Sequence, residues 1–185
     1  MKHDVVNYWS EVKLDIVKEY AQAYSTIICG QKKVPLNHAY IDAFAGSGQH
    51  FSKEKGEFIP GSPLNALNID PPFKEHHLID LDRNKTNHLR EICRDRNDVR
   101  VYEGDCNGIL LKEVFPNINY EKYRRGLCLL DPYGLHLNWE VIETAGKKKN
   151  LEIFLNFPVM DMNMNALWHN PESADPQQVA RMTAF

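Results

Sequence analysis

Five short apolar segments alternate with helical segments along this chain, and this alternation restricts the possible folds more than any other feature. The strand-like segments are residues 38–44, 76–81, 99–102, 126–130 and 151–157. The helical segments are residues 8–28, 64–69, 84–94, 109–115 and 139–145. Strands that alternate with helices form a mostly parallel sheet covered on both faces. We therefore expect an α/β fold, a three-layer Rossmann-like sandwich in which ligands bind beyond the carboxyl ends of the strands.

The 185 residues suit a single domain. We expect an N-terminal helix within residues 1–30, the Rossmann-like core over residues 38–158, and the start of an incomplete C-terminal region over residues 159–185. No sixth or seventh strand pattern follows Pro158, so we expect a fragment that lacks the last strands of its sheet. Apolar spacings of three and four predict the buried face of the first helix: Trp9, Val12, Ile16, Tyr20, Ala23 and Ile27.

Three local signals concern the connections between these segments. The polar, glycine-bearing residues 49–62 predict a loop. Ser62 before Pro63 predicts a helix N-cap, and Gly146 predicts the end of the helix that covers residues 139–145. Asp82 before Asn84 is also typical of an N-cap.

Composition and charge limit the classes of function. The formal net charge of −3 gives no general attraction to nucleic acid, although arginines and lysines cluster locally. The four cysteines are widely spaced and form no C-x-x-C pair, so we expect neither a metal site nor a disulfide framework. The sequence has no apolar run long enough for a membrane span and no signal-peptide core at its N-terminus. We expect a protein of the reducing cytoplasm with no membrane partner.

The first strand runs into a glycine turn, Tyr-Ile-Asp-Ala-Phe-Ala-Gly-Ser-Gly, over residues 40–48. Glycines at such a turn let backbone amides approach a ligand closely. The stretch resembles the first motif of S-adenosylmethionine-dependent methyltransferases, where it holds the methionine part of the cofactor. The absence of a third glycine after Gly48 disfavours a dinucleotide site. The candidate cofactor-binding residues here are Asp42, Phe44, Ala45, Gly46 and Gly48.

Acidic residues also follow the second and third strands. Asp80 and Asp82 end the second strand, where a carboxylate accepts hydrogen bonds from ribose hydroxyls. We favour Asp80 for this contact and expect Asp82 to cap the following helix. Asp105 and Cys106 follow the third strand, and the Asp105 carboxylate is a candidate acceptor for the exocyclic amine of an adenine ring.

The fourth strand ends in Leu-Leu-Asp-Pro-Tyr-Gly, residues 129–134. In methyltransferases that act on amino groups, an Asp or Asn, then prolines, then an aromatic residue close this strand. The carboxylate accepts hydrogen bonds from the target amine and the ring stacks on a flat base. The candidate catalytic residues are therefore Asp131, Pro132 and Tyr133. The sequence departs from the pattern with one proline and with Gly134, which leaves a plain Asp-Pro turn as the alternative.

Two more residues fall near the same pocket by topology. His136 follows the fourth strand, and Asn156 ends the fifth within Asn156-Phe157-Pro158.

The combination of motifs closely resembles the three-Cys-motif partner protein family, bacterial proteins with a methyltransferase-like fold. The likeness covers most of the chain, and its motifs are the helix at residues 9–13, residues 40–48, Gly61-Ser62-Pro63-Leu64, Asp131-Pro132-Tyr133-Gly134 and Asn156-Phe157-Pro158. It implies a class I methyltransferase fold, S-adenosylmethionine as cofactor, and association with a partner that carries a three-cysteine motif and looks like a radical S-adenosylmethionine protein. The cysteines of this chain inherit no role, because the three-cysteine motif belongs to the partner.

These observations leave three hypotheses about function. The first is an S-adenosylmethionine-dependent methyltransferase acting on a nucleobase nitrogen, with a nucleic acid as substrate. The second is a non-catalytic binding module that docks the three-cysteine-motif partner, and the single proline of the Asp-Pro-Tyr motif and the acidic charge favour it. The third is an NAD-dependent oxidoreductase, which the missing third glycine disfavours.

Overall fold

The computed structural model describes residues 4–165 and 171–184. Five parallel strands form its main sheet, in the order β6-β5-β2-β7-β8. They are β2 (Asn37–Asp42), β5 (Glu75–Asp80), β6 (Val99–Glu103), β7 (Arg124–Leu130) and β8 (Leu151–Leu155). The chain first enters the sheet at its centre and then builds outward in both directions, as in doubly wound folds. The carboxyl ends of all five strands therefore lie at one edge of the sheet.

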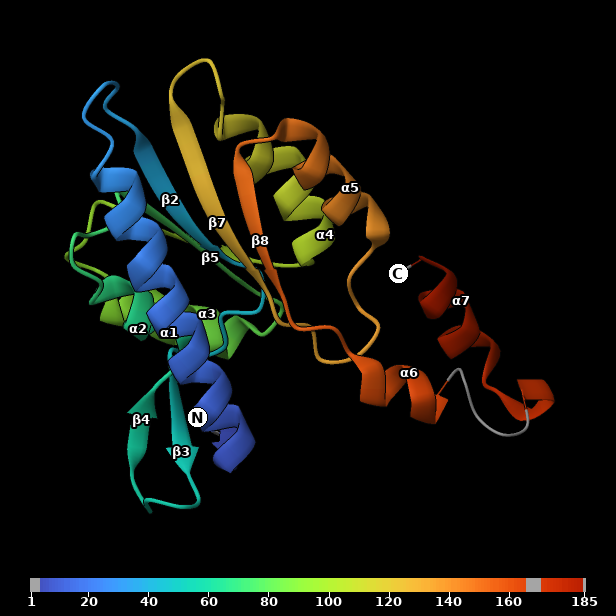
Figure 1. Ribbon diagram of the computed structural model, residues 1–185. Helices are drawn as coiled ribbons and strands as arrows, with labels where there is room; N and C mark the ends of the chain where they lie inside the picture. Colours follow the sequence, from blue (N-terminus) through green and yellow to red (C-terminus); the bar gives the residue numbers. More distant parts are fainter. Residues whose placement is uncertain (1–3, 166–170, 185) are drawn as a thin grey trace.

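Helices cover both faces of the sheet and make three layers (Figure 1). On one face lie α1 (Tyr8–Cys29), α2 (Ser62–Leu67) and α3 (Arg83–Ile92). On the other lie α4 (Cys106–Ile109), the turns η1 (Leu110–Val114) and η2 (Phe115–Asn117), and α5 (Trp139–Lys148). This arrangement confirms the predicted fold class, an α/β three-layer sandwich with a parallel sheet.

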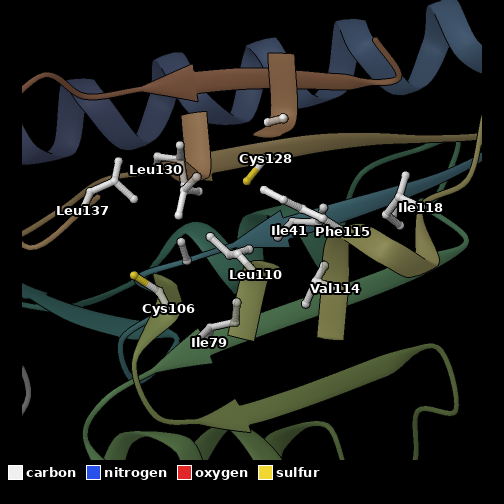
Figure 2. Packing of buried hydrophobic residues seen from close by; sticks show 14 residues of the cluster. Ile41, Ile79, Cys106, Leu110, Val114, Phe115, Ile118, Cys128, Leu130 and Leu137 are labelled. Atoms are coloured by element: carbon white, nitrogen blue, oxygen red, sulfur yellow. The ribbon is translucent and has the colours of Figure 1, made fainter. Parts of the chain in front are cut away.

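Two hydrophobic cores fill the space between these layers, because successive side chains of a strand point to opposite faces. Tyr40 of β2 packs toward α1, whereas its neighbour Ile41 packs toward η1. Figure 2 shows strand residues Ile41, Ile79, Cys128 and Leu130 packed against Leu110, Val114 and Phe115. All seven side chains are fully buried. The apolar runs of the sequence are thus explained by burial on both faces of each strand.

The predicted loop at residues 49–62 is wrong, because a second, smaller sheet occupies it. β3 (Gln49–Ser52) and β4 (Phe58–Pro60) form an antiparallel hairpin, and β1 (Asp4–Val6) pairs in parallel with β3. Strands of three or four residues are too short to show an alternating pattern, and the partner strand comes from the N-terminus. The hairpin lies below the N-terminal half of α1 in Figure 1.

The predicted buried face of α1 is also wrong. Trp9 is 74% exposed and Ile27 is 62% exposed, whereas Leu14, Val17 and Ala21 are buried. Both sides of the helix carry apolar residues, so periodicity alone does not select between them. The buried side includes small residues, which allow close packing on the sheet, and the exposed stripe keeps the large ones.

Helix boundaries agree with the sequence signals only in part. Asp82 caps α3 as predicted, since its side chain accepts hydrogen bonds from the backbone amides of Asn84 and Lys85 at 2.7 and 3.3 Å. The N-cap of α2 is Gly61 and not Ser62, whose hydroxyl instead hydrogen-bonds the carboxyl of the buried Asp42. Helix α5 continues through the predicted stop at Gly146 and ends at Lys148.

After β8 the described chain is helical, with α6 (Val159–Asn165), η3 (Pro171–Ser173) and α7 (Pro176–Ala184). No strand occurs in residues 156–165 or 171–184, so β8 is an edge of the main sheet within the described ranges. That the chain is a fragment lacking further strands stays a prediction. Among the residues described, no helix is both long and apolar enough to cross a membrane.

Candidate functional site

A cavity of about 490 Å³ lies at the carboxyl ends of β2, β5 and β6. Its volume falls within the range of about 300 to 1,000 Å³ that is typical of small-molecule sites. Six predicted site residues line it: Phe44, Asp80, Asp82, Asp105, Cys106 and Tyr133. The rest of the wall comes from Ala43, Leu81, Lys85, Gly104 and His136. The fold thus brings together residues that end or follow four separate strands, β2, β5, β6 and β7, as their order predicted.

The glycine turn after β2 supports this cavity from behind. The backbone amide of Gly46 donates a hydrogen bond to Asp80 Oδ2 at 2.8 Å, and the Ala45 amide donates to the carbonyl of Ile79 at 2.8 Å. Gly48 has a φ of 84°, and a Cβ there would lie 3.0 Å from the Leu89 side chain. Ala45, Gly46 and Gly48 are therefore structural neighbours of the cavity and not part of its lining.

Asp80 is the predicted residue best placed to bind a ligand. Its Oδ2 accepts from the Gly46 amide and its Oδ1 accepts from the Asp82 amide at 2.8 Å. Each carboxylate oxygen has two lone pairs, so both oxygens retain acceptor capacity toward the cavity. The two backbone donors fix the orientation of the carboxylate before any ligand binds.

Asp105 and Cys106 form the wall at the end of β6. Asp105 is the N-cap of α4, and its carboxylate accepts from the Gly108 amide at 3.1 Å and from Asn107 Nδ2 at 2.9 Å. Burial raises the pKa of the Cys106 thiol to about 12, which keeps it a neutral, apolar contact surface. The Asp105 carboxylate therefore has a capping role in addition to its place in the cavity wall.

Asp42 lies beneath the site and is fully buried. Its carboxyl accepts hydrogen bonds from the Phe44 amide at 3.2 Å and from the Tyr40 hydroxyl at 3.4 Å. Burial raises the pKa of Asp42 to about 7, against the hydrogen bonds that lower it. Asp42 lines neither cavity, and it contacts the site through the backbone amide of Phe44 and through Ser62, which lines the second cavity.

A second cavity, of about 370 Å³, adjoins the first, because Phe44 and Tyr133 line both. Asp131 and Pro132 from the end of β7 line the second cavity, as does Asn156 from the end of β8. Its remaining polar lining comes from Asp4, Ser10, Lys13, His50 and Ser62. The three predicted catalytic residues thus lie together, next to the cavity that holds most of the predicted cofactor residues.

The Asp131 carboxylate is held between two side chains from distant parts of the chain. Lys13 Nζ on α1 lies 2.5 Å from Oδ2, and Asn156 Nδ2 donates to Oδ1 at 2.8 Å. Lys13 and Asp131 are 34% and 27% exposed, so the pair lies at the border between cavity and solvent. These two side chains therefore fix the orientation of the Asp131 carboxylate. A plain Asp-Pro turn would not need such contacts.

A second ion pair lies beside the shared wall. Lys85 Nζ is 2.7 Å from Asp4 Oδ2 and 5.7 Å from the ring centroid of Tyr133. Tyr133 itself is 64% exposed, so its ring is accessible to a ligand. The wall between the two cavities is thus made of two aromatic rings with a lysine close to one of them.

Sequence reasoning missed Lys13 and Lys85 as residues of the site. Lys13 and Asp131 are 118 residues apart, and nothing local to either residue indicates the contact. Lys85 follows the cap of α3 by one turn, which places it at the end of β5, but an exposed helix is the ordinary reading of that position. His136 and Asn156, which topology placed near the pocket, line the first and second cavity respectively.

Neither a family model nor a curated protein matches this sequence. Among solved structures, the chain is similar to protein LPL1258 from Legionella pneumophila, with a TM-score of 0.51 and 18% identity over 73% of this chain and 64% of that chain. At this identity the likeness shows the fold alone.

Two other solved structures are less similar. They are yhhF from Escherichia coli, with a TM-score of 0.45 and 19% identity over 76% of this chain and 64% of that chain, and a methyltransferase from Geobacter sulfurreducens, with a TM-score of 0.43 and 15% identity over 71% of this chain and 53% of that chain. With TM-scores below 0.5, they add nothing to the first. In each of the three cases the chain spans less than two thirds of the matched protein.

Proposed function

We propose that this chain is an S-adenosylmethionine-dependent methyltransferase that acts on an exocyclic or ring nitrogen of a nucleobase. The observation that carries the proposal is the pair of adjoining cavities at the carboxyl ends of the strands. Asp80 and Asp105 line one of them, and Asp131 lines the other. A cofactor in the first and an acceptor in the second would meet at the wall formed by Phe44 and Tyr133.

The lining of the first cavity fits the cofactor. The free lone pairs of Asp80 would accept from the two ribose hydroxyls, and the Asp105 carboxylate would accept from the adenine amine. Phe44 and the neutral Cys106 offer apolar surface to the rings. When bound, S-adenosylmethionine supplies an electrophilic methyl group.

The second cavity would hold the acceptor. The Asp131 carboxylate, oriented by Lys13 and Asn156, would accept a hydrogen bond from the target amine and leave the nitrogen lone pair free. The exposed ring of Tyr133 would stack on the flat base. The Pro132 carbonyl, which already accepts from the Gly134 amide at 3.0 Å, is a further acceptor beside them. Alignment of this kind requires no strong general base.

Calorimetric titration with S-adenosylhomocysteine tests the cofactor site. We expect micromolar binding to the wild type and its loss in Asp80→Ala, while the control Asp95→Ala, at a side chain 88% exposed, binds like the wild type. Asp131→Ala should bind S-adenosylhomocysteine normally and transfer no methyl group to nucleosides, RNA or DNA. No binding to the folded wild type would refute the proposal, and loss of binding in Asp131→Ala would place that residue in the cofactor cavity.

The second candidate function is a non-catalytic module that docks a three-cysteine-motif partner. The large apolar side chains exposed along α1 favour it, because an uncovered apolar stripe is typical of an interaction surface. Trp9, Ile16 and Ile27 are 74%, 53% and 62% exposed. Binding of S-adenosylhomocysteine without methyl transfer to any RNA or DNA pool would support this function over the first.

A further inference from the structure

We propose that the second cavity recognises a ring nitrogen next to an exocyclic amine, the edge shared by adenine and cytosine, and that Lys13 contacts the ring nitrogen. The inference rests on the proposed function, because it specifies the acceptor of the same site. It assigns a specificity-determining role to a residue of α1, an element outside the strand-end motifs. Asp131 would contact the exocyclic amine, and Lys13 would contact the adjacent ring nitrogen of the same base.

The contact between Lys13 and Asp131 provides a donor beside an acceptor. An ammonium group has three N–H donors, and the 2.5 Å contact with Asp131 Oδ2 uses one of them. The Asp131 carboxylate accepts from Lys13 and from Asn156, and its two oxygens keep further lone pairs. A ligand that replaces part of this contact must itself present an acceptor beside a donor.

The edge of adenine or cytosine has that pattern. In both bases the exocyclic amine donates and the adjacent ring nitrogen accepts. Amine donation to Asp131 would therefore bring the ring nitrogen toward Lys13, and the two contacts together would fix the plane of the ring. An aliphatic amine lacks the second contact, and a base without an amine lacks the first.

The surroundings of the pair agree with a ligand of this size. The cavity of about 370 Å³ is at the small end of the usual range for ligand sites, which suits one base with its sugar. Its apolar lining includes Phe44 and Tyr133, the rings that also line the first cavity. Stacking on Tyr133 would hold the base with its amine toward the shared wall.

A role for Lys13 in stability alone makes a different prediction. The Lys13–Asp131 pair is partly exposed, so its loss should cost little stability. Such a loss would lower the melting temperature of a Lys13 variant without changing which bases bind. A difference in affinity between base analogues therefore distinguishes a role of Lys13 in base recognition from a role in holding α1 in place.

The test is a calorimetric titration of nucleosides into the full chain, with and without saturating S-adenosylhomocysteine. The probes are cytidine against 3-deazacytidine and adenosine against 1-deazaadenosine, since each analogue lacks only the ring nitrogen. In the wild type we expect each deaza analogue to bind about 10- to 100-fold more weakly, the ratio typical of a lost hydrogen bond to a charged group. Lys13→Met should bind both members of a pair equally, Lys13→Arg should retain part of the difference, and Lys18→Met, an exposed lysine on the same helix, should behave as wild type.

The outcomes separate this inference from the cofactor site. Binding of S-adenosylhomocysteine with equal binding of both members of each pair, or with no nucleoside binding, would overturn the inference and leave the cofactor site intact. Selectivity that depends on Lys13 in the absence of S-adenosylhomocysteine binding would support the second cavity and refute the methyltransferase. Titration with short single-stranded oligo(dC) and oligo(dA) then distinguishes binding of a base within a strand from binding of a free nucleoside. In either case the inference requires that Lys13→Met lose the selectivity.

Discussion

Histidines lie near the start of the neighbouring strands β2 and β5, whereas aspartates end both strands. His38 lies near the start of β2 and Asp42 at its end, and His76 and Asp80 hold the corresponding places in β5. At the amino edge of the sheet the histidines are buried among aromatic rings. At the carboxyl edge Asp80 faces a cavity. The same strands therefore build a closed edge of packed aromatic groups and an open edge that holds the candidate site.

The amino edge is organised around Phe73. Its ring lies 4.8 Å from the ring of His38, 5.5 Å from that of Tyr40 and 5.9 Å from that of His76, measured between centroids. The Ser25 hydroxyl lies 2.8 Å from His38 Nε2. Aromatic groups in contact of this kind contribute to stability through burial and ring geometry.

The two edges differ in what their polar groups do. Connections at the carboxyl edge begin with turns that contain glycine or aspartate, and their backbone amides orient carboxylates such as Asp80. The amino edge also carries polar side chains, but these pair with one another, as Arg96 does with Asp98 and Arg124 with Glu75. It is closed by α1 and the segment before β5. Four experiments test how far the two edges are separable.

The largest effect on stability should come from Phe73→Ala. Removal of a buried aromatic ring costs about 3 to 5 kcal/mol of the free energy of unfolding. Because Phe73 is far from the cavities in the fold, the folded variant should bind S-adenosylhomocysteine like the wild type. Urea denaturation and calorimetry measure the two properties. A weakened ligand affinity with unchanged stability would contradict the separation of the two edges.

The second effect concerns Asp42 and a rise in pH toward neutrality. Burial raises the pKa of Asp42 from 3.8 to about 7, so between these values the folded protein keeps a proton that the unfolded chain has lost. Its contribution to stability is therefore complete below pH 3.8 and is lost as the pH rises through about 7. Between pH 5 and pH 7 the lost stability amounts to about 2 kcal/mol.

Asp42→Asn removes the titration and should flatten this part of the pH profile. Free energies of unfolding from urea denaturation of both proteins across this pH range measure the slope, whatever the absolute stability of the variant. Parallel profiles for wild type and variant would show that Asp42 is ionised in the folded protein.

The third effect has the opposite sign and lies at the amino edge. Burial, with smaller contributions from the charges of Lys74 and His76, lowers the pKa of His38 from 6.5 to about 4. Between pH 6.5 and pH 4, His38 binds a proton in the unfolded chain but stays neutral in the folded protein. The free energy of unfolding therefore falls as the pH drops from 6.5 toward 4. By pH 5 the loss is about 2 kcal/mol.

His38→Gln should remove that part of the acid sensitivity and leave the part that comes from His76 and His77, whose pKa values burial also lowers. Thermal unfolding at several pH values, followed by circular dichroism, measures it. An acid limb identical to that of the wild type would assign the loss of stability to other groups.

The smallest effect should come from Gly134→Ala, in the loop that follows Tyr133. Gly134 has a φ of 80°, and a Cβ there would lie 2.7 Å from Asp161 Oδ2, which accepts a hydrogen bond from the Leu135 amide at 3.1 Å. A left-handed conformation at a non-glycine residue costs about 1 kcal/mol. Differential scanning calorimetry measures the shift in melting temperature. A loss as large as that of Phe73→Ala would mean that the carboxyl edge also carries the stability of the fold.

Much of the core could be predicted from local patterns. The five strands of the main sheet were predicted at nearly their observed positions, because each is an apolar run between polar turns, and burial on both faces requires such runs. The positions of Asp80, Asp105 and Asp131 at strand ends followed from the same segments. Once the strands are parallel, their carboxyl ends must lie together, so the cavity could be anticipated from the order of the motifs.

Other features depend on contacts that no local pattern contains. The sheet formed by β1, β3 and β4 joins strands from two regions, each too short to show alternation. The two apolar sides of α1 are equivalent in the sequence, and packing on the sheet selected the side with Leu14, Val17 and Ala21. Lys13 enters the site because that choice turns it toward the end of β7.

Local patterns in the sequence are enough to specify the α/β class, the order of the strand-end motifs and the position of the candidate site. The physical reason is that hydrophobic periodicity and turn chemistry act over a few residues. Three features depend on the packing of the whole chain: Lys13 and Asn156 orient Asp131, Asp42 is buried beneath the turn, and Phe44 and Tyr133 line both cavities. Those arrangements follow from how helices and strands pack across long stretches of chain, and packing is a property of the whole fold.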